Sequence, residues 1–197
     1  MRYSAQHKAR THAQLLKEAT EQFRSQGLQG TGIAKLMGQV GLTHGGFYGH
    51  FEGKDDLVAA TVTRMFEEVV EYRRKAIEGA PKGKELAAIV NSYLSEAHRD
   101  HPEKGCLISV LAPEIARQST SVRRAYTKGF NSQIDKLAVY MPGADVEERR
   151  RNARLLISGM SGTMMIARAV NDPQLSNQIL AQAREFYISA FESPARG

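Results

Sequence analysis

The 197-residue chain is basic, with 27 Lys and Arg residues against 21 Asp and Glu residues, a formal net charge of +6 and a hydrophobic content of 42%. This length accommodates one medium domain or a small head on a larger body, and the charge favours an anionic partner such as DNA, RNA or an acidic membrane. The single cysteine, Cys106, excludes an internal disulfide framework, and the lack of an apolar leader or of an apolar stretch of ~20 residues predicts a cytoplasmic protein with no membrane partner.

The first quarter of the chain concentrates the positive charge. Residues 1–54 contain seven Lys or Arg side chains and three Glu side chains, which gives +4 of the total of +6. Apolar residues recur at helical spacing over His7–Ser25, and Gly27 is expected to end this helix. Thr31 suits the N-cap of a short helix over Ile33–Val40.

Residues 41–43 join this short helix to a second one, over residues 44–50, with helix-turn-helix spacing. Gly41 permits a tight turn, Thr43 suits the N-cap of the second helix, and Phe47 suits its inner face. The first turns of such a helix present polar or small side chains to base edges and phosphates. The pattern therefore predicts a DNA-reading element.

The rest of the chain shows helical periodicity between proline and glycine breaks, and clear strand alternation appears nowhere. We therefore expect an all-α fold of nine helices, without a cofactor. After the first three, the expected helices span Lys54–Gly79, Lys84–Asp100, Cys106–Arg117, Ser119–Met141, Asp145–Val170 and Gln174–Phe191.

The run from Gly27 to Leu57 closely resembles the head of the TetR family of transcriptional regulators. It contains the family's glycine, its Phe47-Tyr48 aromatic pair and its helix-opening Lys54. Residues 105–116, with a Gly-Cys-Leu motif, and 159–169 look like ligand-domain helices of one branch of the family. The resemblance covers essentially the whole chain and is strongest over residues 10–60.

This resemblance implies a helix-turn-helix DNA-binding domain over residues 1–53 and a ligand-binding and dimerisation domain over residues 54–197. It implies a regulator, usually a repressor, that binds a palindromic operator as a homodimer and is released by a small apolar or electrophilic effector. The arm from Arg2 to Arg10 would track phosphates or enter a minor groove. The implied DNA-contacting residues are Thr31, Thr43, His44, Gly45, Gly46, Tyr48, His50 and Lys54.

The expected recognition helix, over residues 44–50, carries Gly45, Gly46 and Gly49, and glycines make a helix less stable. Each helical glycine costs about 0.5–1 kcal/mol relative to alanine, and none offers a side chain to read a base. We therefore expect sequence discrimination to depend on His44, on close approach of the backbone and on DNA shape. Replacing Gly45 and Gly46 with alanine and measuring operator discrimination tests this hypothesis.

The resemblance also implies an effector pocket among the middle helices, where apolar and aromatic residues favour an apolar effector. These residues equally suit a helical core. Cys106 either follows Lys104 at a helix start, as a thiol that senses oxidants or electrophiles does, or is a buried core residue. The candidate pocket residues are Met65, Phe66, Val69, Tyr72, Tyr93, Cys106, Leu107, Leu111, Phe130, Ile134 and Met164.

Small residues interrupt an apolar face on the last two long helices, which lets two helices approach closely. This pattern predicts a dimer interface, although a four-helix core would also explain it. The candidate interface residues are Leu155, Ser158, Gly159, Gly162, Ile166, Ile179 and Phe186.

Other function classes remain possible from the residues alone. Cys106 with His98 or His101 as a base would suit an enzyme, but no third group orients the base. The same three side chains would suit a metal site, but a fourth ligand is missing. A helical ligand-binding protein whose basic head meets a protein or a membrane is the third alternative, and it predicts no salt-dependent binding to duplex DNA.

Overall fold

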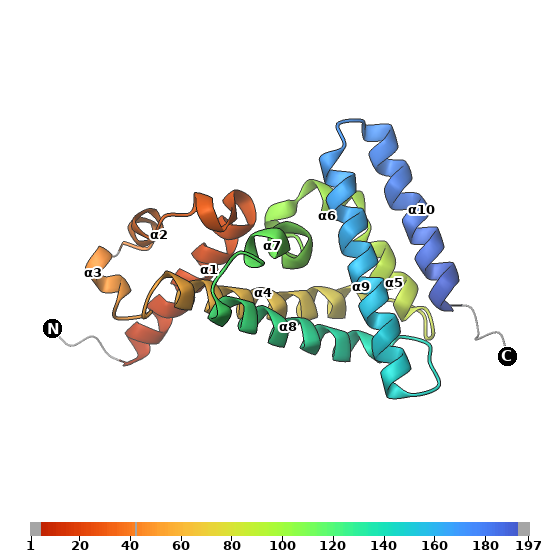
Figure 1. The fold of residues 1–197 in the computed structure, drawn as a ribbon, viewed down its shortest axis with the longest axis horizontal. Helices are drawn as coiled ribbons and strands as arrows, with labels where there is room; N and C mark the ends of the chain where they lie inside the picture. The colour runs from red at the N-terminus through yellow and green to blue at the C-terminus, as the bar shows by residue number, and fades with distance from the viewer. Residues whose placement is uncertain (1–4, 42, 193–197) are drawn as a thin grey trace.

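The computed structural model describes residues 5–41 and 43–192, which contain helices and no strand (Figure 1). The predicted all-α class is confirmed. No helix of the described residues is long and apolar enough to cross a membrane. The elements are α1 (Ala5–Gly30), α2 (Ile33–Gln39), α3 (His44–Phe47), α4 (Lys54–Ile77), α5 (Glu85–Tyr93), α6 (Glu96–Asp100), the 3-10 helix η1 (Pro102–Lys104), α7 (Leu107–Ile115), α8 (Thr120–Ala138), α9 (Val146–Ala169) and α10 (Pro173–Glu192).

Helices α1–α3 form a head at one end of the molecule, and α4–α10 form a body (Figure 1). Helix α4 leaves the head and runs through the body beside α8, with which it makes the most extensive helix contact. Helices α9 and α10 lie side by side at the far end and cross the direction of α4. Because α1 also packs on α4 and α7, the head and the body share a long boundary.

The sequence of α4 explains why it forms the spine of the molecule. Its apolar residues recur every three or four positions, so that one stripe, including Leu57, Val58 and Met65, is at most 2% exposed. Acidic residues occupy its first turn and basic residues its last turn, where each charge is favourable to the helix dipole.

Glycine 27 interrupts α1 rather than ending it. Its φ of +74° lies in the left-handed region that favours glycine, and the chain then resumes a helical course to Gly30. The predicted N-cap at Thr31 is wrong, because Gly32 occupies that position. The Thr31 side chain instead turns back, and its hydroxyl donates to the Gly27 carbonyl at 3.1 Å.

The helix expected over Lys84–Asp100 is two helices, α5 and α6. Leu94 leaves the helical conformation, and Ser95 is extended, with φ −89° and ψ 155°. The Ser95 hydroxyl accepts from the backbone N–H of His98 at 3.1 Å and so caps a new helix. Apolar periodicity continues across this break, which is why the sequence pattern missed it.

Candidate functional site

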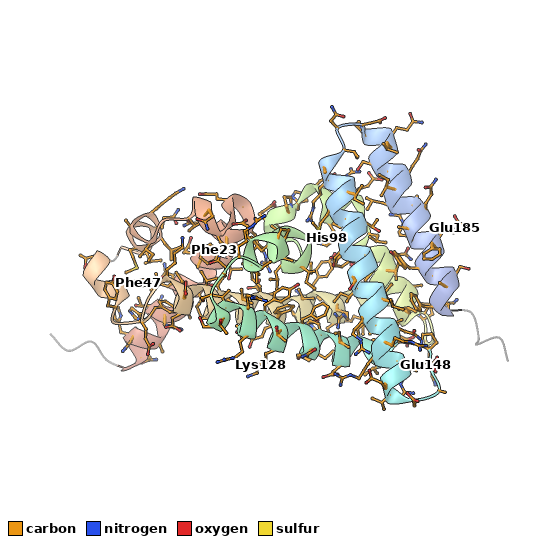
Figure 2. All side chains as sticks on the ribbon, viewed as in Figure 1. Phe23, Phe47, His98, Lys128, Glu148 and Glu185 are labelled. Carbon is orange, nitrogen blue, oxygen red and sulfur yellow. The ribbon has the colours of Figure 1, made fainter. Side chains whose placement is uncertain are left out.

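A small apolar core holds α2 and α3 against α1. Phe23 of α1, Leu36 and Met37 of α2 and Phe47 of α3 are each at most 1% exposed. The ring centroids of Phe47 and Phe51 lie 5.6 Å apart. Figure 2 places Phe47 on the inner side of α3. The prediction that Phe47 forms the inner face of this helix is confirmed.

The turn between α2 and α3 has the expected geometry. Gly41 has a φ of +68°, and Thr43 is extended, with φ −78° and ψ 157°, as the N-cap of α3. The Thr43 side chain makes no capping hydrogen bond. Helix α3 is shorter than predicted, since it ends at Phe47 and the chain turns over residues 48–50. Gly49 therefore lies outside the helix.

Several predicted DNA-contacting residues of the head face outward. Thr43 and Gly45 are exposed, the Tyr48 side chain is 62% exposed, and His50 and Lys54 are half-buried. A Cβ atom added to Gly45 would meet no atom within 4 Å, so the surface there is open to a partner. The half-buried Gly46 lies one residue further along the same short helix.

Two of the predicted DNA-contacting residues, Thr31 and His44, are not among those seen to face outward. Thr31 is 3% exposed and its hydroxyl is already bonded, so a phosphate contact by this side chain stays a prediction that requires it to turn outward. His44 opens α3, but its side chain lies outside the described part of the chain, as do residues 1–4 of the arm and Leu42.

Positive charge surrounds the turn that follows α3. Burial of His50, together with repulsion from His12, Lys8 and His7, lowers the pKa of His50 below its ordinary value of 6.5. No ion pair between described residues neutralises Lys8 or Lys54. This side of the head therefore presents uncompensated cationic groups beside exposed polar and glycine positions, as a phosphate-binding surface requires.

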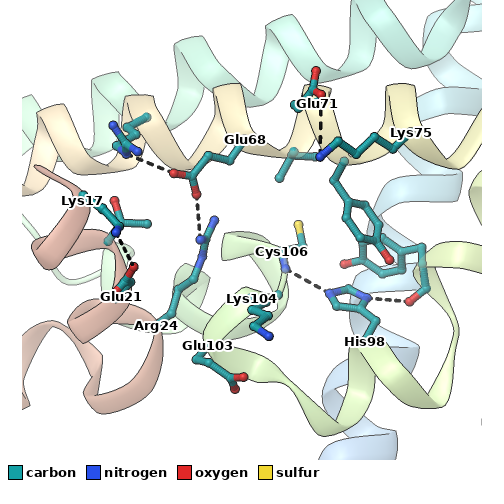
Figure 3. A pocket seen from close by; sticks show the side chains of 16 residues that line it. Lys17, Glu21, Arg24, Glu68, Glu71, Lys75, His98, Glu103, Lys104 and Cys106 are labelled. Atoms are coloured by element: carbon teal, nitrogen blue, oxygen red, sulfur yellow. Dashed lines mark hydrogen bonds and ion pairs between the residues drawn. The ribbon is translucent and has the colours of Figure 1, made fainter. Parts of the chain in front are cut away.

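A cleft of about 390 Å³ lies where the head meets the body. Helices α1 and α4 and the segment from α6 to the start of α7 form its walls (Figure 3). Charged side chains at its rim pair with one another: Glu68 accepts from Arg24 at 2.8 Å and from Arg64 at 3.0 Å. Because Arg24 belongs to α1 and Glu68 to α4, this pair joins the head to the body.

Buried polar groups form the inner end of the cleft. The backbone N–H of Cys106 donates to His98 Nε2 at 3.0 Å, which leaves the proton of the neutral ring on Nδ1, where it bonds to the Tyr93 carbonyl at 2.6 Å (Figure 3). Both ring nitrogens of His98 are thus engaged in the fold. The Tyr93 hydroxyl bonds to Ser161 at 3.0 Å, and burial raises the pKa of this phenol.

Burial lowers the pKa of His98 from 6.5 to about 4, because the interior disfavours the charged ring. The folded state therefore resists protonation of His98. The contribution of this neutral ring to the free energy of unfolding is complete above pH 6.5 and falls as the pH drops towards 4, by about 3 kcal/mol in total. Replacing His98 with Gln keeps a neutral donor and acceptor, so we expect H98Q to lose less stability than the wild type between pH 7 and pH 4. Urea denaturation at both pH values measures this, and an identical loss in the two proteins would refute it.

The predicted effector residues divide between the cleft and the core. Val69, Tyr72, Tyr93 and Cys106 line the cleft. Phe130 is half-buried and stacks on Tyr126 at a centroid distance of 6.0 Å. The remaining six are buried in the apolar core and do not line the cleft, namely Met65, Phe66, Leu107, Leu111, Ile134 and Met164.

Helices α9 and α10 expose large apolar side chains. Leu155, Ile166 and Phe186 are 59%, 57% and 64% exposed, and all three stand on the two helices at the far end of the body. Gly159 instead serves the packing between α9 and α10, because a Cβ atom there would lie 2.1 Å from the Tyr187 hydroxyl. Of the other candidate interface residues, Ser158 is exposed, Gly162 is half-buried and Ile179 packs against the core.

Two residues of importance were missed from the sequence. Glu114 of α7 accepts from the backbone N–H groups of Leu28 at 2.8 Å and of Gln29 at 3.3 Å, across the boundary between head and body. Arg73 of α4 is buried, with an exposed fraction of 9%. Neither carries a local signal, since each stands in a helix where a charged residue usually faces solvent.

Two family models match the chain. The model for bacterial regulatory proteins of the tetR family covers residues 15–61, and the model for the C-terminal domain of LmrA/YxaF-like transcriptional regulators covers residues 83–182. A comparison with curated protein sequences gave no match.

Solved structures share the fold over nearly the full chain. The reduced form of Escherichia coli NemR superposes with a TM-score of 0.77 at 19% identity, covering 94% of this chain and 98% of its own. A TetR-family regulator from Cytophaga hutchinsonii gives 0.78 at 19% identity, covering 97% and 98%. SCO4454 from Streptomyces coelicolor gives 0.71 at 22% identity, covering 94% and 97%. With both family models matched in order along one chain, this protein belongs to the TetR family of transcriptional regulators, which are DNA-binding transcription factors and not enzymes.

Proposed function

We propose that this chain is a repressor that binds a palindromic operator as a homodimer and is released by a small effector. The observation that carries the proposal is the position of the cleft, whose wall includes α1 of the cationic head. A molecule bound there contacts the element that supports the helix-turn-helix. Ligand occupancy and the orientation of the head are therefore coupled by direct contact.

The exposed apolar side chains on α9 and α10 support the dimer. Leu155, Ile166 and Phe186 lie at the end of the body that is far from the head. A two-fold pairing through these helices would bury them and leave both heads free. One short recognition helix reads few base pairs, whereas two related by symmetry read two half-sites at a fixed spacing.

A small effector with an apolar portion or an electrophilic centre fits the inner end of the cleft. Tyr72, Tyr93 and Cys106 line it there, and a volume of about 390 Å³ lies within the range of small-molecule sites. Release from DNA requires the effector to bind the DNA-free arrangement more tightly than the DNA-bound one. Filling the cleft would separate α1 from α4, tilt the head and change the spacing of the two recognition helices.

Binding to the intergenic DNA beside the protein's own gene tests the proposal. Purified protein is titrated against this DNA at several salt concentrations with random duplex as competitor. We expect competitor-resistant binding by a dimer that weakens as salt rises, because each phosphate contact releases counterions. Binding equal to that of random duplex here, and no enriched site in a genome-wide selection of bound fragments, would contradict the proposal.

Replacing Lys54 with Ala is expected to weaken operator binding without changing sequence preference. Lys54 opens α4 beside the recognition segment and has no ion-pair partner among the described residues. Since a dimer carries two copies, the slope of log affinity against log salt should fall by about two. The control is K82A, an exposed lysine beyond the other end of the 24-residue helix α4, about 36 Å from Lys54 by helix length. Equal slopes for K54A and K82A would contradict the prediction.

A further inference from the structure

Arg73 carries a charge in the interior of the body that the protein leaves unbalanced. Its side chain is 9% exposed, and its Nη2 atom donates to Gln133 Oε1 at 2.8 Å. Its Nη1 atom is buried and has no hydrogen-bond partner. Among the ion pairs between described residues, none involves Arg73.

The surroundings of Arg73 are fixed in a way that leaves Nη1 available. Gln133 is 1% exposed, and its Nε2 atom donates to the Phe66 carbonyl at 2.7 Å, which turns its oxygen towards Arg73. Burial lowers the pKa of Arg73, and the nearby groups that oppose this are Cys106 and Tyr140, neither of which is a carboxylate. A guanidinium stays protonated in proteins, so Arg73 is a buried cation with no anion paired to it among the described residues.

Arg73 lines a small cavity of about 30 Å³ whose other walls are mainly apolar. This space has room for a water molecule. Its walls include Val69, Tyr72, Tyr93 and Cys106, and the same four residues line the larger cleft. The two spaces are therefore separated by a single layer of side chains.

Tyr72 is the movable part of this layer. Its side chain is 46% exposed, and its hydroxyl bonds at the surface to the Ser92 carbonyl at 3.2 Å and the Ser92 hydroxyl at 2.9 Å. Surface hydrogen bonds exchange readily with water, so rotation of Tyr72 loses little. This rotation would join the cleft to the cavity and give a ligand access to Arg73.

We propose that the effector is an amphipathic carboxylic acid whose carboxylate pairs with Arg73 and whose apolar portion fills the joined cavity and cleft. This inference rests on the proposed function, because it gives the chemical class of that regulator's effector. A carboxylate matches the unpartnered Nη1 atom of the guanidinium and the apolar walls. A phosphate dianion would bring more charge and more acceptors than the lining can satisfy.

A series of straight-chain carboxylates from butanoate to decanoate, together with benzoate, tests the proposal against the primary amides of the same acids. Isothermal titration calorimetry on the full chain is expected to detect at least one acid, with an affinity tenfold or more above that of its amide. In R73Q, which removes the charge but keeps a donor for Gln133, the acid should bind at least tenfold more weakly and the amide unchanged. R73K should retain part of the acid affinity.

Three results would overturn the inference: no acid of the series binds, the acids bind no better than their amides, or R73Q binds the acids as tightly as the wild type. Circular dichroism and thermal unfolding establish that each variant is folded. Measuring operator binding distinguishes a failure of the proposed effector class from a failure of the proposed function. If the acid requires Arg73 but no operator exists, the regulator proposal fails alone. If R73Q and the wild type bind the operator equally and the acid releases neither, the effector class fails alone.

Discussion

Replacing Gly129 with Ala is expected to lower the free energy of unfolding by about 1–3 kcal/mol, the usual effect of overpacking a filled core. Gly129 lies on α8 and faces Phe66 of α4. A Cβ atom at this position would lie 2.0 Å from Cδ2 and 2.6 Å from Cε2 of the Phe66 ring. That ring is 3% exposed and its centroid lies 5.5 Å from that of Tyr126, so making room for the new methyl group requires the ring to leave this packing.

Gly38 provides the matched control, because it lies in α2 and a Cβ atom there would meet nothing within 4 Å. G38A removes a helical glycine without a clash, so it should leave stability unchanged or raise it by up to about 1 kcal/mol. Urea denaturation of both variants measures the difference. A G129A protein as stable as G38A would show that α4 and α8 separate more easily than their close contact indicates.

Much of this architecture follows from local sequence signals. The helix periodicity, the tight turn at Gly41, the N-cap at Thr43 and the start of α4 at Lys54 were all predicted, because each depends on residues within one or two turns. The division of the segment over 84–100 was not, since apolar periodicity runs through the Ser95 cap. Where two local patterns overlap within a few residues, as the apolar periodicity and the Ser95 cap do, tertiary packing decides which of them the chain follows.

The candidate sites were harder to predict than the helices. Periodicity identifies buried faces but does not separate a core position from a cavity wall, so Val69 and Met65 looked alike and only Val69 lines the cleft. The burial of Arg73 depends on Gln133, 60 residues further along the chain. The contact of Glu114 with Leu28 spans 86 residues. No pattern within a helix carries information over such separations.

The contact of Glu114 with the head is expected to control operator affinity. The left-handed conformation at Gly27 breaks the hydrogen bonding of α1, and the Glu114 carboxylate accepts from the amides that this break exposes, at Leu28 and Gln29. The contact leaves no room for a side chain at Gly27, where a Cβ atom would lie 2.5 Å from Glu114 Oε1. Helix α2 begins shortly afterwards, so this carboxylate fixes the position from which the helix-turn-helix starts.

Replacing Glu114 with Ala removes hydrogen bonds to a charged acceptor, which contribute about 1.5–3 kcal/mol. If operator binding requires the head in this position, affinity should fall about tenfold to a hundredfold. Hydrogen exchange should quicken at residues 28–40 and stay unchanged in α8 and α9. The control is E67A, an exposed glutamate of α4 without an ion pair among the described residues. Wild-type operator affinity in E114A would mean that DNA itself orders the head, and that the effector must act through α4 alone.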